Sequence, residues 1–138
     1  MERFFVVTNE GKDKDGQVTG RVKALLEARG KSCTLCEDAW KDMTADSMPK
    51  DIDCAIVIGG DGTLIGVARL LKKEVPIMGI NMGTLGYLTE IEVDRIEESL
   101  DQILSGHYML EDRMMLDGIF DDGGENVALN DIVLSRKG

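Results

Sequence analysis

Residues Cys54–Thr63 read Cys-Ala-Ile-Val-Ile-Gly-Gly-Asp-Gly-Thr, and this stretch decides the fold that the sequence predicts. Its apolar run Ala55–Ile58 is typical of a strand that is covered on both faces, as in a parallel α/β sheet. The apolar residues that follow the glycines have helical spacing: Leu64, Ile65, Ala68 and Leu71. The stretch therefore predicts a buried strand, a glycine-rich turn and a helix, in that order.

The glycine-rich turn has the composition of an anion site that also holds a carboxylate. Gly59, Gly60 and Gly62 allow a tight turn and leave backbone N–H groups accessible to a ligand. Unpaired amides and the helix dipole at such a turn favour phosphate. Asp61 would repel phosphate, so its presence needs a chemical reason. The simplest reasons are that it binds a metal ion or takes a proton from a substrate hydroxyl.

The remaining segments up to residue 106 extend this pattern. Three more runs predict strands: Arg3–Thr8, Ser32–Cys36 and Ile77–Ile80. Two helices are predicted by their apolar faces, one with Val18, Val22, Leu25 and Leu26, the other with Ile96, Leu100, Ile103 and Leu104. Gly30 and Gly106 are expected to end them, and Asp94 with Glu97 has the form of a capping box. We therefore predict an α/β domain over residues 1–106, with a parallel, three-layer, Rossmann-like sheet.

The pattern changes after residue 106. Met109–Phe120 and Asn126–Ser135 predict two antiparallel strands around the turn at residues 121–124. A hairpin alone is marginally stable in water. We therefore expect residues 107–138 to be the first strands of a second, all-β domain, most of which is missing from this chain.

Composition excludes several function classes. The chain has 138 residues, of which 43% are hydrophobic and 30% charged, values that are typical of a soluble globular protein. A net charge of −10 argues against nucleic acid or an anionic membrane as the main partner. It leaves room for a nucleotide, since Mg²⁺ can supply positive charge locally. No apolar run of about 18 residues and no leader pattern is present, so we expect neither a membrane span nor a signal peptide.

Cysteine and histidine offer little for catalysis. Cys33 and Cys36 form a C-x-x-C pair without a second pair to complete a zinc site. We interpret them, with Cys54, as ordinary strand cysteines in a reducing cytoplasm. His107, the only histidine, follows a predicted helix end and is expected to be a surface or packing residue.

Three ordered motifs identify a family. The turn has neither the Walker string nor the third glycine of a dinucleotide fingerprint, because Ile65 stands in that place. What remains is Gly-Gly-Asp-Gly-Thr, which phosphofructokinases and diacylglycerol, sphingosine and NAD kinases share. Asn81–Thr89 (NMGTLGYLT) resembles the NAD kinase pattern N-x-G-x-L-G-F-L-T, with tyrosine for phenylalanine, and Asn130-Asp131 resembles that family's N-[ED] pair. The chain thus resembles the amino-terminal half of the NAD kinases.

The resemblance implies a reaction and a role for each motif residue. It implies phosphoryl transfer from ATP, or polyphosphate, to the adenosine-ribose 2′-hydroxyl of NAD with Mg²⁺, giving NADP. Asp61 would be the catalytic base, and Gly60 and Gly62 would let the dinucleotide approach the backbone. The remaining binding residues would be Asn81, Tyr87 against the adenine, and Asn130 and Asp131 on the ribose. The family further implies a cytoplasmic homo-oligomer whose carboxy-terminal domain completes the NAD site, so we expect this chain alone to be inactive.

Two alternatives stay open at this point. The chain could come from a lipid or sugar kinase of the wider Gly-Gly-Asp-Gly superfamily, although the Asn81–Thr89 loop disfavours this. It could also be a nucleotide-binding module without chemistry, in which the glycines make only a strand-to-helix turn.

Overall fold

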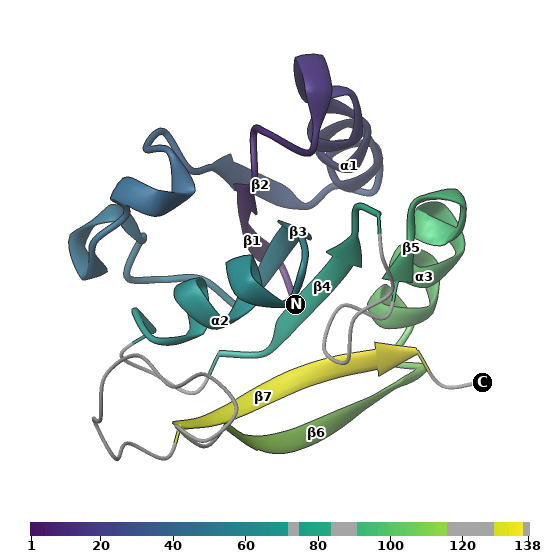
Figure 1. Cartoon of the computed structure of the whole chain (residues 1–138). Coiled ribbons are helices and arrows are strands. Elements are labelled where there is room, and N and C mark those ends of the chain that lie inside the picture. Colours follow the sequence, from purple (N-terminus) through teal and green to yellow (C-terminus); the bar gives the residue numbers. More distant parts are fainter. Residues whose placement is uncertain (72–74, 84–90, 116–128, 137–138) are drawn as a thin grey trace.

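A computed structural model describes residues 1–71, 75–83, 91–115 and 129–136, and these residues form one seven-stranded sheet between two layers of helices (Figure 1). The strands are β1 (Arg3–Thr8), β2 (Ser32–Leu35), β3 (Cys54–Gly59), β4 (Ile77–Asn81), β5 (Ile91–Glu92), β6 (Tyr108–Met115) and β7 (Leu129–Arg136). The α-helices are α1 (Gln17–Ala28), α2 (Asp61–Ala68) and α3 (Ile96–Leu104). Short 3₁₀ turns are η1 (Lys14–Gly16), η2 (Trp40–Asp42), η3 (Ala45–Ser47) and η4 (Val93–Arg95).

The strand order is β2-β1-β3-β4-β7-β6, with β5 also paired to β4. All these pairs are parallel except β6 with β7. The predicted parallel, three-layer α/β fold is confirmed.

The central strand β3 explains why the apolar run decides the fold. All six of its residues are buried, and alternate side chains belong to two separate cores. Ile56 and Ile58 pack in one core, whereas Ala55 and Val57 pack in the other. A strand with helices over both faces needs apolar residues at every position, as the sequence predicts.

The two cores correspond to the two helical layers. Val22 of α1 and Leu100 of α3 pack with Phe4 in the first core. Leu64 of α2 packs with Phe5 in the second core. Neighbouring residues of β1 therefore face opposite helical layers, and α2 alone among the three α-helices covers the second face (Figure 1).

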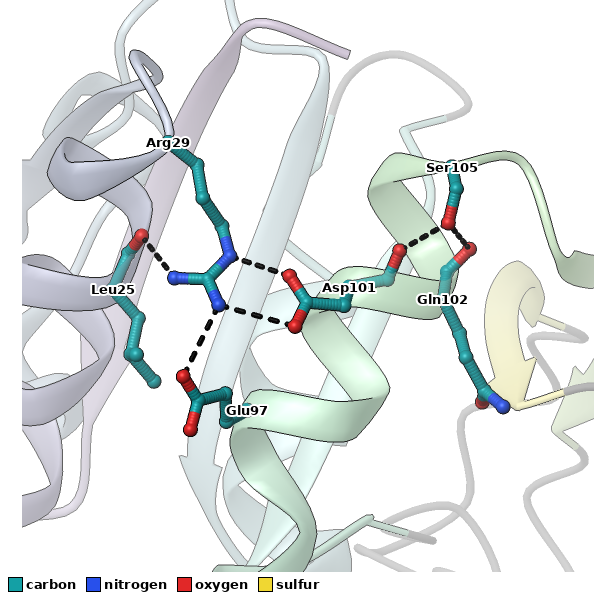
Figure 2. Close-up of polar contacts among 6 residues, drawn as sticks. All are labelled: Leu25, Arg29, Glu97, Asp101, Gln102 and Ser105. Carbon is teal, nitrogen blue, oxygen red and sulfur yellow. Dashed lines mark hydrogen bonds and ion pairs between the residues drawn. The ribbon is translucent and has the colours of Figure 1, made fainter.

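An arginine joins the two helices of the first layer (Figure 2). Arg29, just after α1, donates from Nε to Asp101 Oδ1 at 2.5 Å and from Nη2 to Asp101 Oδ2 at 3.1 Å. The same guanidinium donates to Glu97 at 3.2 Å and to the Leu25 carbonyl at 3.0 Å. Hydrogen bonding from Arg29 lowers the pKa of Asp101. This planar, two-bonded contact links α3 to the end of α1.

Two helix-end predictions have different outcomes. Gly30 and Gly106 follow α1 and α3 with φ of +73° and +85°, so the predicted glycine stops are confirmed. The predicted capping box is wrong: Asp94 lies within η4, and α3 has Arg95 as its N-cap without a side-chain cap. The chain tightens into a 3₁₀ turn before the helix, which moves the cap position away from Asp94.

The carboxy-terminal hairpin joins the same sheet. β6 and β7 pair antiparallel from Tyr108 opposite Arg136 to Met115 opposite Leu129, as predicted. β7 also pairs with β4 through Ile77 opposite Val133. The predicted turn at residues 121–124 lies outside the described residues, and the predicted domain boundary at residue 106 stays a prediction.

Candidate active site

The loops that follow three parallel strands lie at one edge of the sheet. β1, β3 and β4 are neighbours, and their carboxyl ends meet there. The Asn9 amide, after β1, donates to the Ile58 carbonyl at 2.8 Å. The Met82 amide, after β4, donates to the Gly59 carbonyl at 2.9 Å, and Asn81 stands opposite Gly59 in register. The glycine turn after β3 is therefore central at the edge where open α/β sheets bind ligands.

The turn itself is one residue long. Gly60 is extended and serves as the N-cap of α2, and Asp61 is the first helical residue. The Leu64 amide closes the first helical turn on the Gly60 carbonyl at 3.1 Å. Because its N-cap residue is a glycine, α2 has no cap from a side chain at that position. The amino end of α2 thus offers backbone donors and the positive end of its dipole to an anion.

The two sides of the turn differ in how much room they leave. A Cβ built on Gly59 would lie 2.8 Å from Thr63 Oγ1 and 3.2 Å from Asn9 Cβ, so the packing there admits only glycine. Thr63 is buried and accepts a hydrogen bond from Asn9 Nδ2 at 3.3 Å. Gly62 is exposed, and a Cβ there would meet no atom within 4 Å. One glycine therefore permits close packing of the turn, and the other leaves its outer surface open to a ligand.

A cation from the first loop lies over the turn. A Cβ built on Gly60 would lie 3.1 Å from Lys12 Nζ. Sequence reasoning missed Lys12, as it missed Asn9 and Thr63. A signal was available: Asn9 and Lys12 follow β1, and the carboxyl ends of neighbouring parallel strands share an edge.

The amino end of α1, at the same edge, is closed by a side chain. Asp13 is 4% exposed and accepts from the amides of Val18 and Thr19 at 3.0 and 2.9 Å. It also accepts from the Thr19 hydroxyl at 2.6 Å. Burial alone would raise the pKa of Asp13, but these three bonds outweigh burial and the pKa is lowered. Asp13 thus occupies the anion position of α1, whereas the N-cap of α2 is a glycine.

The structure brings together four of the predicted site residues. Gly60 is the turn, Asp61 and Gly62 follow it as the first residues of α2, and Asn81 stands opposite Gly59 at the end of β4, 6% exposed. A cleft of about 540 Å³ adjoins Asn81. It is lined by Arg21, Asn81, Gly83, Glu92, Val93 and Asp94.

Of the other predicted residues, Asn130 and Asp131 are not brought to the turn. Tyr87 lies outside the described residues. Asn130 and Asp131 precede Val133 in β7, and Val133 stands opposite Ile77, the first residue of β4. Because β4 and β7 are parallel, this register places the pair toward the amino end of β4, away from the glycine turn. Their role in binding stays a prediction.

Cysteine and histidine take no part in the site. Cys33 and Cys36 are free and pack toward opposite cores, as the strand interpretation predicts, and burial raises the pKa of both thiols. His107 is exposed. Among the described residues, no three His, Cys, Asp or Glu side chains form a metal-holding group. Within the residues that the structure describes, no helix has the length and hydropathy needed to cross a membrane.

Chemically, the edge combines the amides and the carboxylate at the start of α2 with a cation from the loop after β1. Backbone amides with a lysine suit phosphate groups. An ionised carboxylate only accepts hydrogen bonds, so Asp61 suits a hydroxyl or a metal-bound phosphate. This is the combination that phosphoryl transfer to an alcohol requires.

Comparison with known proteins shows the family of the chain. The family model of the ATP-NAD kinase N-terminal domain matches residues 4–108. An NAD kinase of Lachnospira eligens is 40% identical over the whole chain and 51% of its own length, and one of Agathobacter rectalis is 42% identical with the same coverage. The chain thus spans about half the length of these relatives.

Two solved structures resemble the fold. The crystal structure of an NAD kinase from Archaeoglobus fulgidus in complex with ATP aligns over 82% of this chain and 41% of its own, with a TM-score of 0.63 and 25% identity. The structure of yeast NADH kinase aligns over 94% of this chain and 46% of its own, with a TM-score of 0.64. At 13% identity, it resembles this chain in fold. On the family match and the relatives together, this chain belongs to the ATP-NAD kinase family and corresponds to its N-terminal domain.

Proposed function

We propose that the whole protein to which this chain belongs is an NAD kinase, which transfers a phosphoryl group from ATP or polyphosphate to the 2′-hydroxyl of the adenosine ribose of NAD. The observation that carries the proposal is Asp61 at the first position of a helix whose N-cap is a glycine, in a chain of this family. ATP as donor is supported by the complex of the Archaeoglobus fulgidus relative.

Asp61 has two tasks in this reaction. It accepts a hydrogen bond from the ribose 2′-hydroxyl and so orients that oxygen toward the phosphoryl group, and it takes the hydroxyl proton as the bond forms. The helix dipole stabilises the carboxylate and lowers its basicity, whereas nearby phosphates act in the opposite direction. Orientation therefore contributes along with proton transfer, since positioning and electrostatics dominate phosphoryl transfer.

The neighbouring residues hold the two substrates. The amides that begin α2, at Gly60 and Gly62, bind phosphate oxygens, and the open surface at Gly62 admits the dinucleotide. Asn81 stands opposite Gly59 and lines the cleft, and it binds the nucleoside. Tyr87, Asn130 and Asp131 are proposed to bind adenine and ribose.

Mg²⁺ fits this donor set when it comes with the nucleotide. It is bound in such sites by one or two carboxylates, substrate phosphates and water. Asp61 offers one carboxylate at the turn, and the described residues hold no dedicated three-ligand cluster. Asp61 and the donor phosphates would hold the ion, which would neutralise phosphate charge.

The protein's setting is proposed on the same basis. We propose a cytoplasmic homo-oligomer that uses neither nucleic acid nor membrane as a partner. Free Cys33, Cys36 and Cys54 support a reducing compartment, and the net charge of −10 supports the exclusion of polyanionic partners.

The test is NADP formation by the full-length protein, read through an NADP-specific dehydrogenase. Asp61→Asn should lower kcat about a hundredfold or more, because it removes the proton acceptor but keeps the shape. Asp51→Asn, at an exposed bend, is the matched control and should leave kcat unchanged. The 138-residue chain alone should form little or no NADP.

Failure of the wild-type protein to form NADP from any donor would overturn the proposed reaction. Full turnover by Asp61→Asn would overturn the role of Asp61 and favour another base.

A further inference from the structure

The loop after β1 brings a positive charge to the glycine turn, and none of the family motifs in the sequence contains it. This charge is Lys12, whose Nζ lies 3.1 Å from where a Cβ of Gly60 would be. Any side chain at position 60 would meet this ammonium. The glycine therefore lets the lysine lie directly over the backbone that begins α2.

We propose that Lys12 is a donor-binding residue, whose ammonium contacts the polyphosphate of the phosphoryl donor above Gly60. The inference rests on the proposed function, in which the turn takes nucleotide phosphates. The proposed contact adds a side-chain cation to the backbone N–H groups of the turn. It also separates the phosphates of the phosphoryl donor from the NAD side of the site.

The backbone that carries Lys12 is anchored to the turn that it covers. The Lys12 amide donates to the Asn9 carbonyl at 3.0 Å, and the Gly11 amide donates to Asn9 Oδ1 at 3.1 Å. Asn9 in turn bonds to Ile58 through its amide and to Thr63 through its side chain. Two of these contacts join the loop directly to residues on either side of the glycine turn. The lysine is therefore presented from a constrained loop.

The residue after Lys12 fixes the other end of the loop. Asp13 is buried and bonded to the first turn of α1. Its carboxylate also fills the anion position of α1, so α1 is not available to bind phosphate. Of the two helix amino ends at this edge, that of α1 is capped by Asp13, and that of α2 is the one with Lys12 above it.

Charge makes this lysine significant. The chain carries a net −10, and Asp61 adds a negative charge at the turn, so a triphosphate meets local repulsion. A compact ammonium close to the turn offsets that repulsion, and within a Debye length its effect is strong. A hydrogen bond between charged groups is also stronger than one between neutral groups.

The experiment measures binding and turnover separately in the full-length protein. Calorimetric titration with inorganic tripolyphosphate should show about tenfold weaker binding for Lys12→Met, and the KM for ATP should rise about as much. The KM for NAD should stay within about twofold of wild type, which general misfolding would not allow. Lys12→Arg should recover most of the affinity. Lys14→Met, two residues along and also exposed, removes the same charge and should change neither constant.

Three outcomes would overturn the inference. They are wild-type tripolyphosphate binding by Lys12→Met, an equal loss in Lys14→Met, and equal increases in the KM for ATP and for NAD. The titration needs no kinase activity. If the protein makes no NADP and Lys12→Met still loses tripolyphosphate binding, the proposed function fails while the role of Lys12 stands.

Discussion

Two strand-to-helix connections lie at the same sheet edge and are built in opposite ways. The connection between β1 and α1 consists of residues 9–16, and buried Asp13 caps the amino end of α1. The connection between β3 and α2 is Gly60 alone, so its N-cap position carries no side chain. Both connections follow buried strands, so the difference does not come from the sheet.

The comparison shows that the two connections at this edge have different roles. The β1–α1 connection satisfies its helix internally and presents Lys12 outward. The β3–α2 connection has no side chain at its N-cap and holds its shape through close packing at Gly59. If this division is correct, substitutions in the first connection should affect mainly stability, apart from Lys12. Those in the second should affect stability or binding according to the side of the turn they occupy.

The sharpest test substitutes the two glycines on either side of the turn. Gly59→Ala would force a Cβ to 2.8 Å from Thr63 Oγ1 and 3.1 Å from Thr63 Cβ. We expect it to lower the free energy of unfolding of the full-length protein by about 1–3 kcal/mol, the usual cost of overpacking. Urea denaturation followed by circular dichroism measures it.

Gly62→Ala is the matched control, because its Cβ enters open space within the first turn of α2. It should leave the stability unchanged or raise it slightly, since alanine favours the helix. It should nevertheless weaken ATP or NAD binding, because it covers the open surface. Equal stability losses for the two variants would contradict the division between packed and open glycines.

The sequence predicts the parts of this edge that local pattern encodes. Apolar runs predict β1 with its observed bounds and β3 within one residue at each end, because strands buried on both faces have few alternatives. The glycines and Asp61 are visible in the motif itself. Two-residue β5 is not predicted, because its pairing with β4 depends on the sheet edge being present.

The remaining site residues could not be predicted from the sequence, because their place in the site depends on contacts between residues that are far apart in the chain. Lys12 reaches Gly60 across 48 positions of sequence, and Asn9 reaches Thr63 across 54. The cap of α1 comes from Asp13, three residues before the N-cap Gly16, so a search for a capping residue at the helix start misses it. The expected capping box at Asp94 fails for the related reason that η4 intervenes.

Removing the cap of α1 should have a smaller effect than overpacking the turn. Asp13→Ala deletes an acceptor for the Val18 amide, the Thr19 amide and the Thr19 hydroxyl. We expect a loss of about 1–2 kcal/mol in the free energy of unfolding, as for other helix caps. Glu10→Ala, exposed in the same connection, is the control and should change stability little. No stability loss in Asp13→Ala would mean that solvent caps α1 equally well.

The smallest expected effect is a pH dependence of the same contact. The three bonds hold the folded-state pKa of Asp13 below its ordinary value of 3.8, although burial acts in the opposite direction. The unfolded chain then binds the proton more tightly than the folded chain, so this contribution to stability is complete above the unfolded pKa. It should be lost as the pH falls through the lowered folded pKa.

The difference in unfolding free energy between wild type and Asp13→Asn isolates this contribution from the other carboxylates. That difference should be constant from about pH 7 to about pH 5 and should shrink toward about pH 3. A difference that grows on acidification would mean that burial dominates and that the folded pKa of Asp13 is raised. In that case Asp13 would be a strained buried acid, and the β1–α1 connection would no longer be the one that satisfies its helix internally.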